Sequence, residues 1–157
     1  DRETSGVMIF AKHKRHKDYL QEQFANREVH RIYHALVEGK PKNNSGTIHE
    51  WLLEDKFLRV KSVKKNHPQA KEAITHFNLE DNDDYASLLQ LTIETGRRHQ
   101  IRVGLANMGC PVVGDEAHGA TGNPIGRIAL HATSLEFLHP ETDDPVRFEA
   151  PIPFGPE

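Results

Sequence analysis

The 157-residue sequence contains one cysteine, Cys110, and therefore cannot form an internal disulfide bond. Such sparing use of cysteine predicts a cytoplasmic protein in which Cys110 is a small core residue. No segment approaches the roughly 20 apolar residues that a membrane helix requires, and no secretory signal pattern opens the chain. The net charge of −3 argues against indiscriminate binding to nucleic acid but is compatible with a local basic face.

Motifs for common cofactors and catalytic groups are also missing. The sequence has no GxGxxG or GxxxxGK[ST] loop for nucleotides and no GxSxG signature of a serine hydrolase. It has 11 histidines but no HExxH motif or paired CxxC motifs, and spacing alone assembles no set of three or four metal ligands. We therefore expect neither a metal nor a cofactor. The chemistry is left to carboxylates, arginines and a tyrosine.

The sequence does contain the pattern of one globular domain spanning residues 1–157, because no linker or repeat divides it. Two helices are predicted, at 13–26, with Leu20 and Phe24 on its apolar side, and at about 97–108. Since predicted strands outnumber helices, we expect an α+β domain with a largely antiparallel sheet. The predicted strands are 6–12, 29–37, 47–53, 57–63, 70–80, 85–93, 127–138 and 146–150.

Basic residues gather at the start of the second predicted helix. Thr95 is a suitable N-cap and Gly109 a suitable end for this helix. Its free N–H groups and dipole suit an anion, and arginines add forked donors that match carboxylate or phosphate. Taken locally, a solvated basic helix end is an equally good interpretation. The residues concerned are Arg97, Arg98, His99, Gln100 and Arg102.

Three other features have two interpretations each. Asp1 precedes a Thr-Ser-Gly turn, but by position alone a disordered terminal residue is the simpler interpretation. Tyr33 lies in an alternating strand, where it is either a core aromatic or a platform on which a base stacks. The basic cluster at the start of the first helix is either a solvated face or a contact for RNA phosphates. Its members are Lys12, Lys14, Arg15 and Lys17.

Several motifs together resemble those of the RluA-type RNA pseudouridine synthases. Residues 1–6 (DRETSG) are similar to the end of that family's HRLDxxTSG motif, and residues 27–39 to its K/R-x-Y-x-A-x-V-x-G strand. Residues 95–102 and 109–115 resemble its TGRxHQIR and GxPIxGD segments, and 130–140 and 150–153 its closing segments. The resemblance covers essentially the whole chain in order. The related RsuA-type group fits less well, because it lacks these TSG and HQIR patterns.

The resemblance implies the pseudouridine synthase catalytic fold, a bent, mostly antiparallel mixed sheet flanked by helices, with an RNA-binding cleft. It implies that Asp1 is the nucleophile, Arg97 its ion-pair partner, and Tyr33 the group that stacks on uracil and assists the late proton transfer. Arg98, His99, Gln100, Arg102 and the basic cluster are weaker candidates for RNA contact. The expected partner is RNA, ribosomal RNA being favoured over transfer RNA, and we expect a monomer that uses no metal, cofactor or membrane.

The implied isomerisation fits these residue types. A carboxylate can attack the target uridine or deprotonate its ribose, and a neighbouring arginine fixes the direction of the carboxylate. A flat aromatic ring can hold the freed base, once the nucleotide has been flipped out of its stack. The alternative hypothesis is a catalytically silent RNA-binding module on the same fold.

The sequence also departs from the family pattern. Gly104 replaces a histidine and His118 replaces the usual aromatic residue, which we expect to affect helix packing or the cleft rim rather than Asp1. The chain begins without methionine and lacks the His-Arg-Leu that precedes the aspartate in the family. We therefore expect that an N-terminal portion is missing, and whether it includes an S4-type domain is left open.

Overall fold

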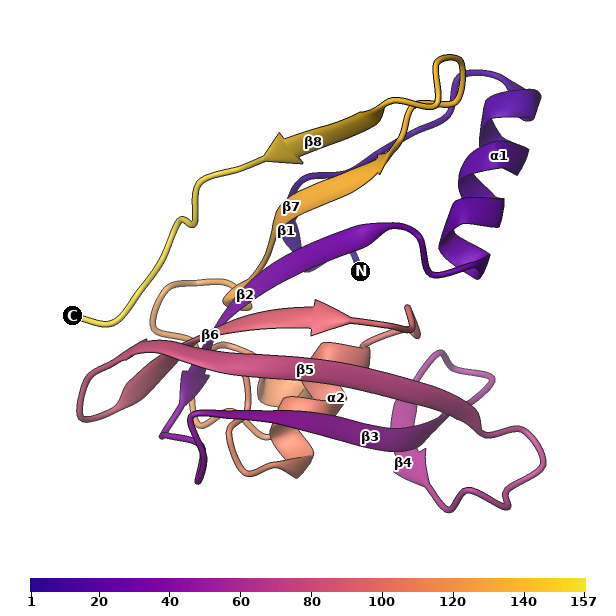
Figure 1. Cartoon of the computed structure of the whole chain (residues 1–157). Helices are drawn as coiled ribbons and strands as arrows, with labels where there is room; N and C mark the ends of the chain where they lie inside the picture. The colour runs from indigo at the N-terminus through magenta and orange to yellow at the C-terminus, as the bar shows by residue number, and fades with distance from the viewer.

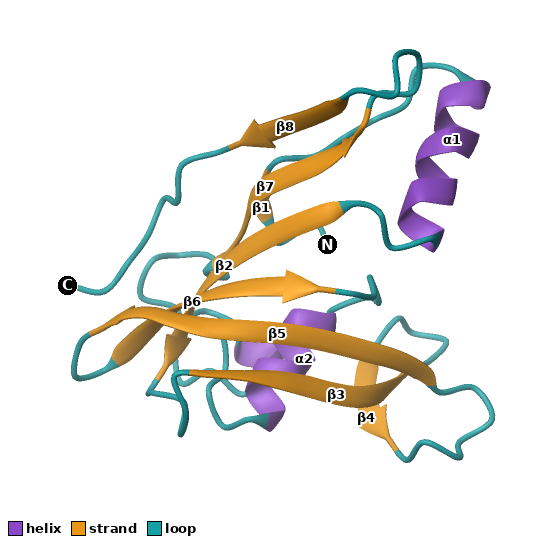
Figure 2. Ribbon diagram, in the orientation of Figure 1, coloured by secondary structure: helices purple, strands orange, loops and turns teal.

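The computed structural model describes residues 1–157 as one sheet of eight strands with two α-helices and a short 3₁₀ helix, η1 (Figures 1 and 2). The strands are β1 (Ser5–Gly6), β2 (His30–Glu38), β3 (Ser45–Glu54), β4 (Val60–Val63), β5 (Lys71–Asn82), β6 (Ala86–Ile93), β7 (Leu130–Leu138) and β8 (Pro145–Glu149). The helices are α1 (Lys14–Ala25), α2 (Gln100–Asn107) and η1 (Glu116–His118). Neither α-helix is long and apolar enough to span a membrane.

The sheet is mixed but almost entirely antiparallel, in the order β1-β7-β2-β6-β5-β3-β4, with β8 pairing to β7. The one parallel pair joins β1 to β7, with Ser5 opposite His131 and Gly6 opposite Ala132. Figure 1 shows that β3 and β5 run at an angle to β2, β7 and β8, so the sheet is bent. The predicted α+β class is therefore confirmed.

The main core lies between the sheet and α2. Residues of β2 and β6 form one buried cluster with Ile101 and Leu105 of α2, and Cys110 joins them as predicted. Burying one such aliphatic side chain contributes about 1.5–3 kcal/mol, so this face holds α2 in place. The buried members are Ala35, Leu36, Val37, Phe77, Leu89, Leu91, Ile101, Leu105, Cys110, Val112, Val113, Ile128, Ala129 and Leu130.

The first helix confirms its predicted position and packing. Leu20 of α1 is buried in a second cluster, and Phe24 packs against that cluster. Gln23 joins α1 to the end of β7, because its Nε2 donates to the Leu138 carbonyl at 2.9 Å and its Oε1 accepts from the Leu138 N–H at 2.7 Å. The other buried members of the cluster are Val29, Leu135 and Phe137.

Most predicted strands are present with shifted ends, but the buried strand predicted at 6–12 is wrong. Only Gly6 and the residue before it pair with β7. Gly6 has a φ of 106°, which ends regular strand geometry. Beyond it, Val7 and Ile9 pack against the second cluster, whereas Met8 and Phe10 are exposed. The apolar run is therefore an extended segment that is half exposed.

The strand predicted at 57–63 begins too early. Asp55 Oδ1 accepts the N–H groups of both Phe57 and Arg59, at 2.8 and 3.0 Å, and Leu58 has a φ of 62°. These contacts form a tight turn between β3 and β4, so β4 starts only at Val60.

The predicted start of α2 is also wrong, while its predicted end is confirmed. The helix begins at Gln100, because His99 has a left-handed φ of 53° that separates the preceding turn from the helix. Thr95 caps no helix N–H, and its hydroxyl donates to the Gln100 side chain instead. The helix ends at Asn107, and Gly109 follows with the positive φ of 85° that suits a C-terminal glycine.

Candidate active site

A buried arginine of α2 joins two aspartates that are far apart in the sequence. Arg102 donates from Nε and Nη2 to the two carboxylate oxygens of Asp115, each at 2.8 Å. Its Nη1 donates to Asp1 Oδ2 at 3.0 Å. Asp115 is fully buried, whereas the Asp1 side chain keeps 15% of its exposure. The forked pair with Asp115 therefore fixes the guanidinium, and the remaining donor holds Asp1 at an accessible position.

Backbone contacts fix Asp1 from the other side. The Glu3 N–H donates to Asp1 Oδ1 at 2.9 Å, and the Thr4 N–H donates to the Asp1 carbonyl at 3.1 Å. The Ser5 hydroxyl lies 2.8 Å from His131 Nδ1 and ties the turn to β7. Asp1 thus has a defined place in the fold, in contrast to the disordered terminal residue that its position alone suggested.

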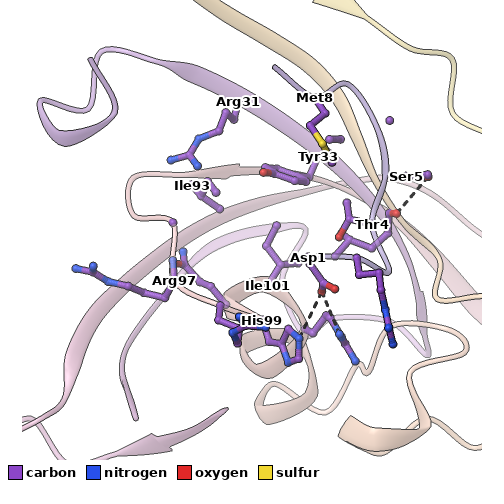
Figure 3. A pocket seen from close by; sticks show the side chains of 18 of the residues that line it. Asp1, Thr4, Ser5, Met8, Arg31, Tyr33, Ile93, Arg97, His99 and Ile101 are labelled. Atoms are coloured by element: carbon purple, nitrogen blue, oxygen red, sulfur yellow. Dashed lines mark hydrogen bonds and ion pairs between the residues drawn. The ribbon is translucent and has the colours of Figure 1, made fainter. Parts of the chain in front are cut away.

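Asp1 faces a cavity of about 630 Å³, a volume in the range of small-molecule sites. Tyr33 of β2 lines the same cavity, so the predicted nucleophile and the predicted stacking residue are brought together (Figure 3). In the pairing of β2 with β7, Tyr33 lies opposite Ala132 and the preceding residue lies opposite Ser134, which leaves an extra residue in β7. Such a bulge changes the direction of neighbouring side chains.

His99 lies beside Asp1 without being its charged partner. Its Nε2 is 3.9 Å from Asp1 Oδ2, and its ring meets that of His118 edge-on at 5.7 Å between centroids. Burial, followed by the positive charge of Arg102, lowers the pKa of His99 to about 4. Burial likewise lowers the pKa of His118. His99 is therefore neutral at pH 7, and Arg102 is the cation that faces Asp1.

Comparison with known proteins assigns the family. Residues 1–107 match the family model described as RNA pseudouridylate synthase. The chain belongs to the RNA pseudouridylate synthase family. The resemblance found in the sequence motifs is therefore confirmed.

The chain spans about half the length of the curated relatives it matches. It is 37% identical over 155 residues to "Uncharacterized RNA pseudouridine synthase YhcT" of Bacillus subtilis, covering 98% of the chain and 51% of the relative. It is 35% identical over 167 residues to "Ribosomal large subunit pseudouridine synthase D" of Xanthomonas campestris, covering 98% and 50%. The structure of human RNA pseudouridylate synthase domain containing 1 superposes with a TM-score of 0.83 at 27% identity, covering 98% of this chain and 67% of the human chain.

Within this pseudouridylate synthase domain, the predicted pair between Asp1 and Arg97 is wrong. Arg97 Nε donates to the backbone carbonyl of Glu72 at 2.9 Å, and Figure 3 shows its side chain extending away from Asp1. The cause is the later start of α2. Because the helix begins at Gln100, Arg97 stays in the exposed turn, and Arg102 in the first helical turn faces the buried side.

The RNA contact predicted for Gln100 is likewise replaced by a structural role. Its Oε1 accepts from the Thr95 hydroxyl at 2.7 Å and from the Arg97 N–H at 3.1 Å. Its Nε2 donates to the Ile74 carbonyl at 3.0 Å and to the Thr75 hydroxyl at 2.9 Å. This buried side chain has its donors and acceptors occupied by the protein, and it ties α2 to β5. The buried Arg102 is similarly committed to its two aspartates.

Other predicted RNA contacts remain at the rim of the cavity. Arg98 and His99 line it together with Arg97. Arg98 Nε is 3.0 Å from Glu54 Oε1, and both side chains are partly exposed. An exposed pair of this kind is weak, so Arg98 can exchange its partner for a phosphate. RNA binding by these residues stays a prediction.

The basic cluster at the start of α1 lies outside the cavity. Two of its members have acidic neighbours, Lys14 with Asp18 at 3.2 Å and Arg15 with Glu141 at 3.5 Å. All members are exposed, and their contact with RNA stays a prediction. They are Lys12, Lys14, Arg15 and Lys17.

The two departures from the family pattern lie in α2 and in η1. A side chain at Gly104 would meet Glu50 Oε1 at 3.2 Å and Ile48 Cγ2 at 3.3 Å, so this glycine permits close packing of α2 on β3. His118 instead contacts the ring of His99, and His99 in turn lies beside Asp1. A single side chain therefore separates His118 from Asp1. The expectation for Gly104 is confirmed, whereas His118 lies nearer to the aspartate than expected.

The histidines gather at no metal site. No group of three or more histidine, cysteine, aspartate or glutamate side chains is placed to hold a metal ion. The buried His34 lies instead between the Thr133 hydroxyl, at 2.6 Å, and Glu80 Oε2, at 3.0 Å.

The sequence motifs pointed to no role for Asp115 or Arg31. Asp115 follows a buried apolar segment, which is a signal for a buried charge that requires a partner. Arg31 lies two residues before Tyr33, on the same face of β2, and lines the cavity. Its Nε is buried and has no hydrogen-bond partner.

Proposed function

We propose that this chain is the catalytic domain of an enzyme that isomerises uridine to pseudouridine in structured RNA, with ribosomal RNA favoured over transfer RNA. The observation that carries the proposal is the Asp1 carboxylate, which Arg102 holds at a cavity that Tyr33 also lines. The preference for ribosomal RNA is supported by the names of two relatives, the large-subunit synthases of Xanthomonas campestris and Vibrio vulnificus. We place the enzyme in the cytoplasm as a monomer.

The reaction breaks the C1′–N1 bond of uridine, rotates the base and joins C1′ to C5. The C5 proton leaves and N1 gains a proton, so the product is an isomer and no electrons are exchanged. Asp1 acts either as a nucleophile or as the base that deprotonates the ribose. Each carboxylate oxygen accepts a hydrogen bond from the protein, one from Arg102 and one from the Glu3 N–H. These bonds aim the carboxylate and leave lone pairs for the substrate.

The rest of the cavity suits a flipped base. Tyr33 offers an aromatic face on which uracil can stack while it rotates. Met8, Ile93 and Ile101 add apolar surface to the lining. A target uridine must leave its stack to enter such a site, which costs a few kcal/mol and favours loops and other unpaired positions.

Replacement of Asp1 by asparagine in the full-length protein tests the proposal. The variant keeps the size of the side chain but removes the charge, so pseudouridine formation should be lost while RNA binding persists. Pseudouridine is measured in ribosomal and transfer RNA after incubation with each protein. Conversion at a near wild-type rate by Asp1→Asn would refute the assignment.

The second hypothesis, a silent RNA-binding module, gives a different result. It predicts RNA binding that weakens steeply with salt but no pseudouridine from the wild-type protein. Mapping pseudouridines in cells with and without the gene then identifies the RNA and the uridine. A site lost only from transfer RNA would refute the preference for ribosomal RNA.

A further inference from the structure

Arg31 is placed to contact the RNA chain beside the target base. It lies two residues before Tyr33 on β2, so the two side chains share a face and start about 7 Å apart along the strand. Both line the cavity of Asp1, and Figure 3 shows them next to each other. Arg31 also lines an adjoining hollow of about 340 Å³ together with Phe24. Arg31 therefore lies between the cavity of Asp1 and the adjoining hollow.

Arg31 differs from the surrounding arginines because it has no hydrogen-bond or ion-pair partner within the protein. Arg27 lies 3.6 and 3.7 Å from two glutamate carboxylates, and Arg98 lies 3.0 Å from another. Arg102 is bound to two aspartates. Arg31 forms no ion pair, and its buried Nε has no hydrogen-bond partner. Its charge and donors are therefore free for a ligand.

The surroundings of Arg31 hold the guanidinium without neutralising it. Its Cζ lies 5.1 Å from the centroid of the Phe24 ring, which provides a flat support. On another side, a Cβ at Gly96 would lie 3.0 Å from Nη1, so the guanidinium packs closely against the backbone of this glycine. A partly buried charged donor without a partner is unfavourable in the free protein. Binding an anion removes that penalty.

We propose that Arg31 binds a backbone phosphate adjacent to the flipped uridine, an inference that rests on the proposed function of the site. A guanidinium presents two parallel N–H donors that match two phosphate oxygens. Uracil is uncharged and stacks on Tyr33, whereas the phosphodiester is the anion that accompanies every nucleotide. Arg31 thus holds the RNA backbone in place while Asp1 contacts the ribose of the target uridine.

Titration with uridine and uridine 3′,5′-bisphosphate tests this proposal, because the second probe carries both flanking phosphates. The wild-type protein should bind the bisphosphate about ten- to a hundredfold more tightly than uridine. In Arg31→Gln this advantage should nearly vanish, and Arg31→Lys should keep part of it. Arg147→Gln is the matched control, because Arg147 pairs with Glu149 on β8 and does not line the cavity. It should keep the full advantage.

A second measurement uses the wild-type protein, so its result does not depend on whether a variant folds. The Nε–H nuclear magnetic resonance signal of Arg31 should shift on addition of the bisphosphate and stay unchanged on addition of uridine. An equal bisphosphate advantage in wild type and Arg31→Gln overturns the proposal, as does the absence of any advantage in the wild type. Pseudouridine formation is assayed separately. Loss of the phosphate effect in Arg31→Gln without any conversion by the wild type would refute the proposed function alone.

Discussion

Replacement of Arg102 by glutamine removes the cation on which the centre of the site depends. The side chain makes hydrogen bonds of 2.8, 2.8 and 3.0 Å to two aspartates, and one of them, Asp115, is fully buried. Without the guanidinium, the charge of Asp115 has no counterion in the interior. Breaking a buried ion pair from one side costs about 3–5 kcal/mol. A typical domain is stable by only about 5–15 kcal/mol, so this loss is severe.

Arg97→Gln provides a matched control, since the same chemical change is made five positions earlier in the chain. Arg97 is exposed, and its side chain donates one hydrogen bond, to the Glu72 carbonyl. Its replacement should cost less than about 1 kcal/mol. Adding Asp115→Asn to Arg102→Gln should restore part of the lost stability, because the unpaired buried charge is then gone.

Urea denaturation followed by circular dichroism gives the free energy of unfolding of each protein, and pseudouridine formation gives its activity. We expect a loss of about 3–5 kcal/mol for Arg102→Gln, together with loss of activity, because Asp1 is no longer held. This prediction fails if Arg97→Gln is as destabilising as Arg102→Gln. It also fails if Arg102→Gln converts uridine at the wild-type rate.

Three further predictions follow from the described contacts. Tyr33→Leu keeps an apolar surface but removes the stacking platform, so binding of the target RNA should weaken about ten- to a hundredfold; unchanged affinity would place the base elsewhere. Burial lowers the pKa of His99 from 6.5 to about 4. As the pH falls, this histidine is therefore protonated in the unfolded protein before it is protonated in the folded protein. The stability linked to neutral His99 is complete above about pH 6.5 and declines towards pH 4, by about 3 kcal/mol at most. His99→Gln should flatten this decline in urea midpoints, and an unaltered slope would contradict it. Gly6→Ala places a methyl carbon 2.1 Å from the Ala132 carbonyl oxygen and should cost more than about 2 kcal/mol. Gly39 also has a positive φ but open space around it, so Gly39→Ala should unfold at a clearly higher temperature than Gly6→Ala.

The strand pattern could be predicted because its signals are local. Leu89 and Leu91 of β6 are buried at alternate positions, and turn residues separate the runs, so the strand period indicates which residues are buried. Motif resemblance placed Asp1 and Tyr33 at a common site, and the structure brings them to one cavity. Positive φ values at His99 and Leu58 could not be predicted, because residues other than glycine adopt that conformation only uncommonly.

The choice between two arginines depends on three-dimensional context. Arg97 and Arg102 both follow the Thr-Gly turn, and either spacing is compatible with a contact to Asp1. The start of α2 decides between them, and that start depends on the Gln100 side chain binding β5. Asp115, which belongs to a third segment of the chain, then accepts hydrogen bonds from Arg102 and fixes its position. No periodicity or local motif contains this information, because it arises from the packing of distant segments.

The parallel pairing of β1 with β7 also dictates when the site can exist during protein synthesis. Ser5 and His131, which meet in this pairing, are 126 positions apart. A contact over such a separation forms only after a long loop has closed. On the ribosome, the strand containing His131 must emerge before the turn that carries Asp1 can dock. A nascent chain that already contains Asp1, Tyr33 and Arg102 therefore still lacks the pairing that holds the turn of Asp1 against the sheet.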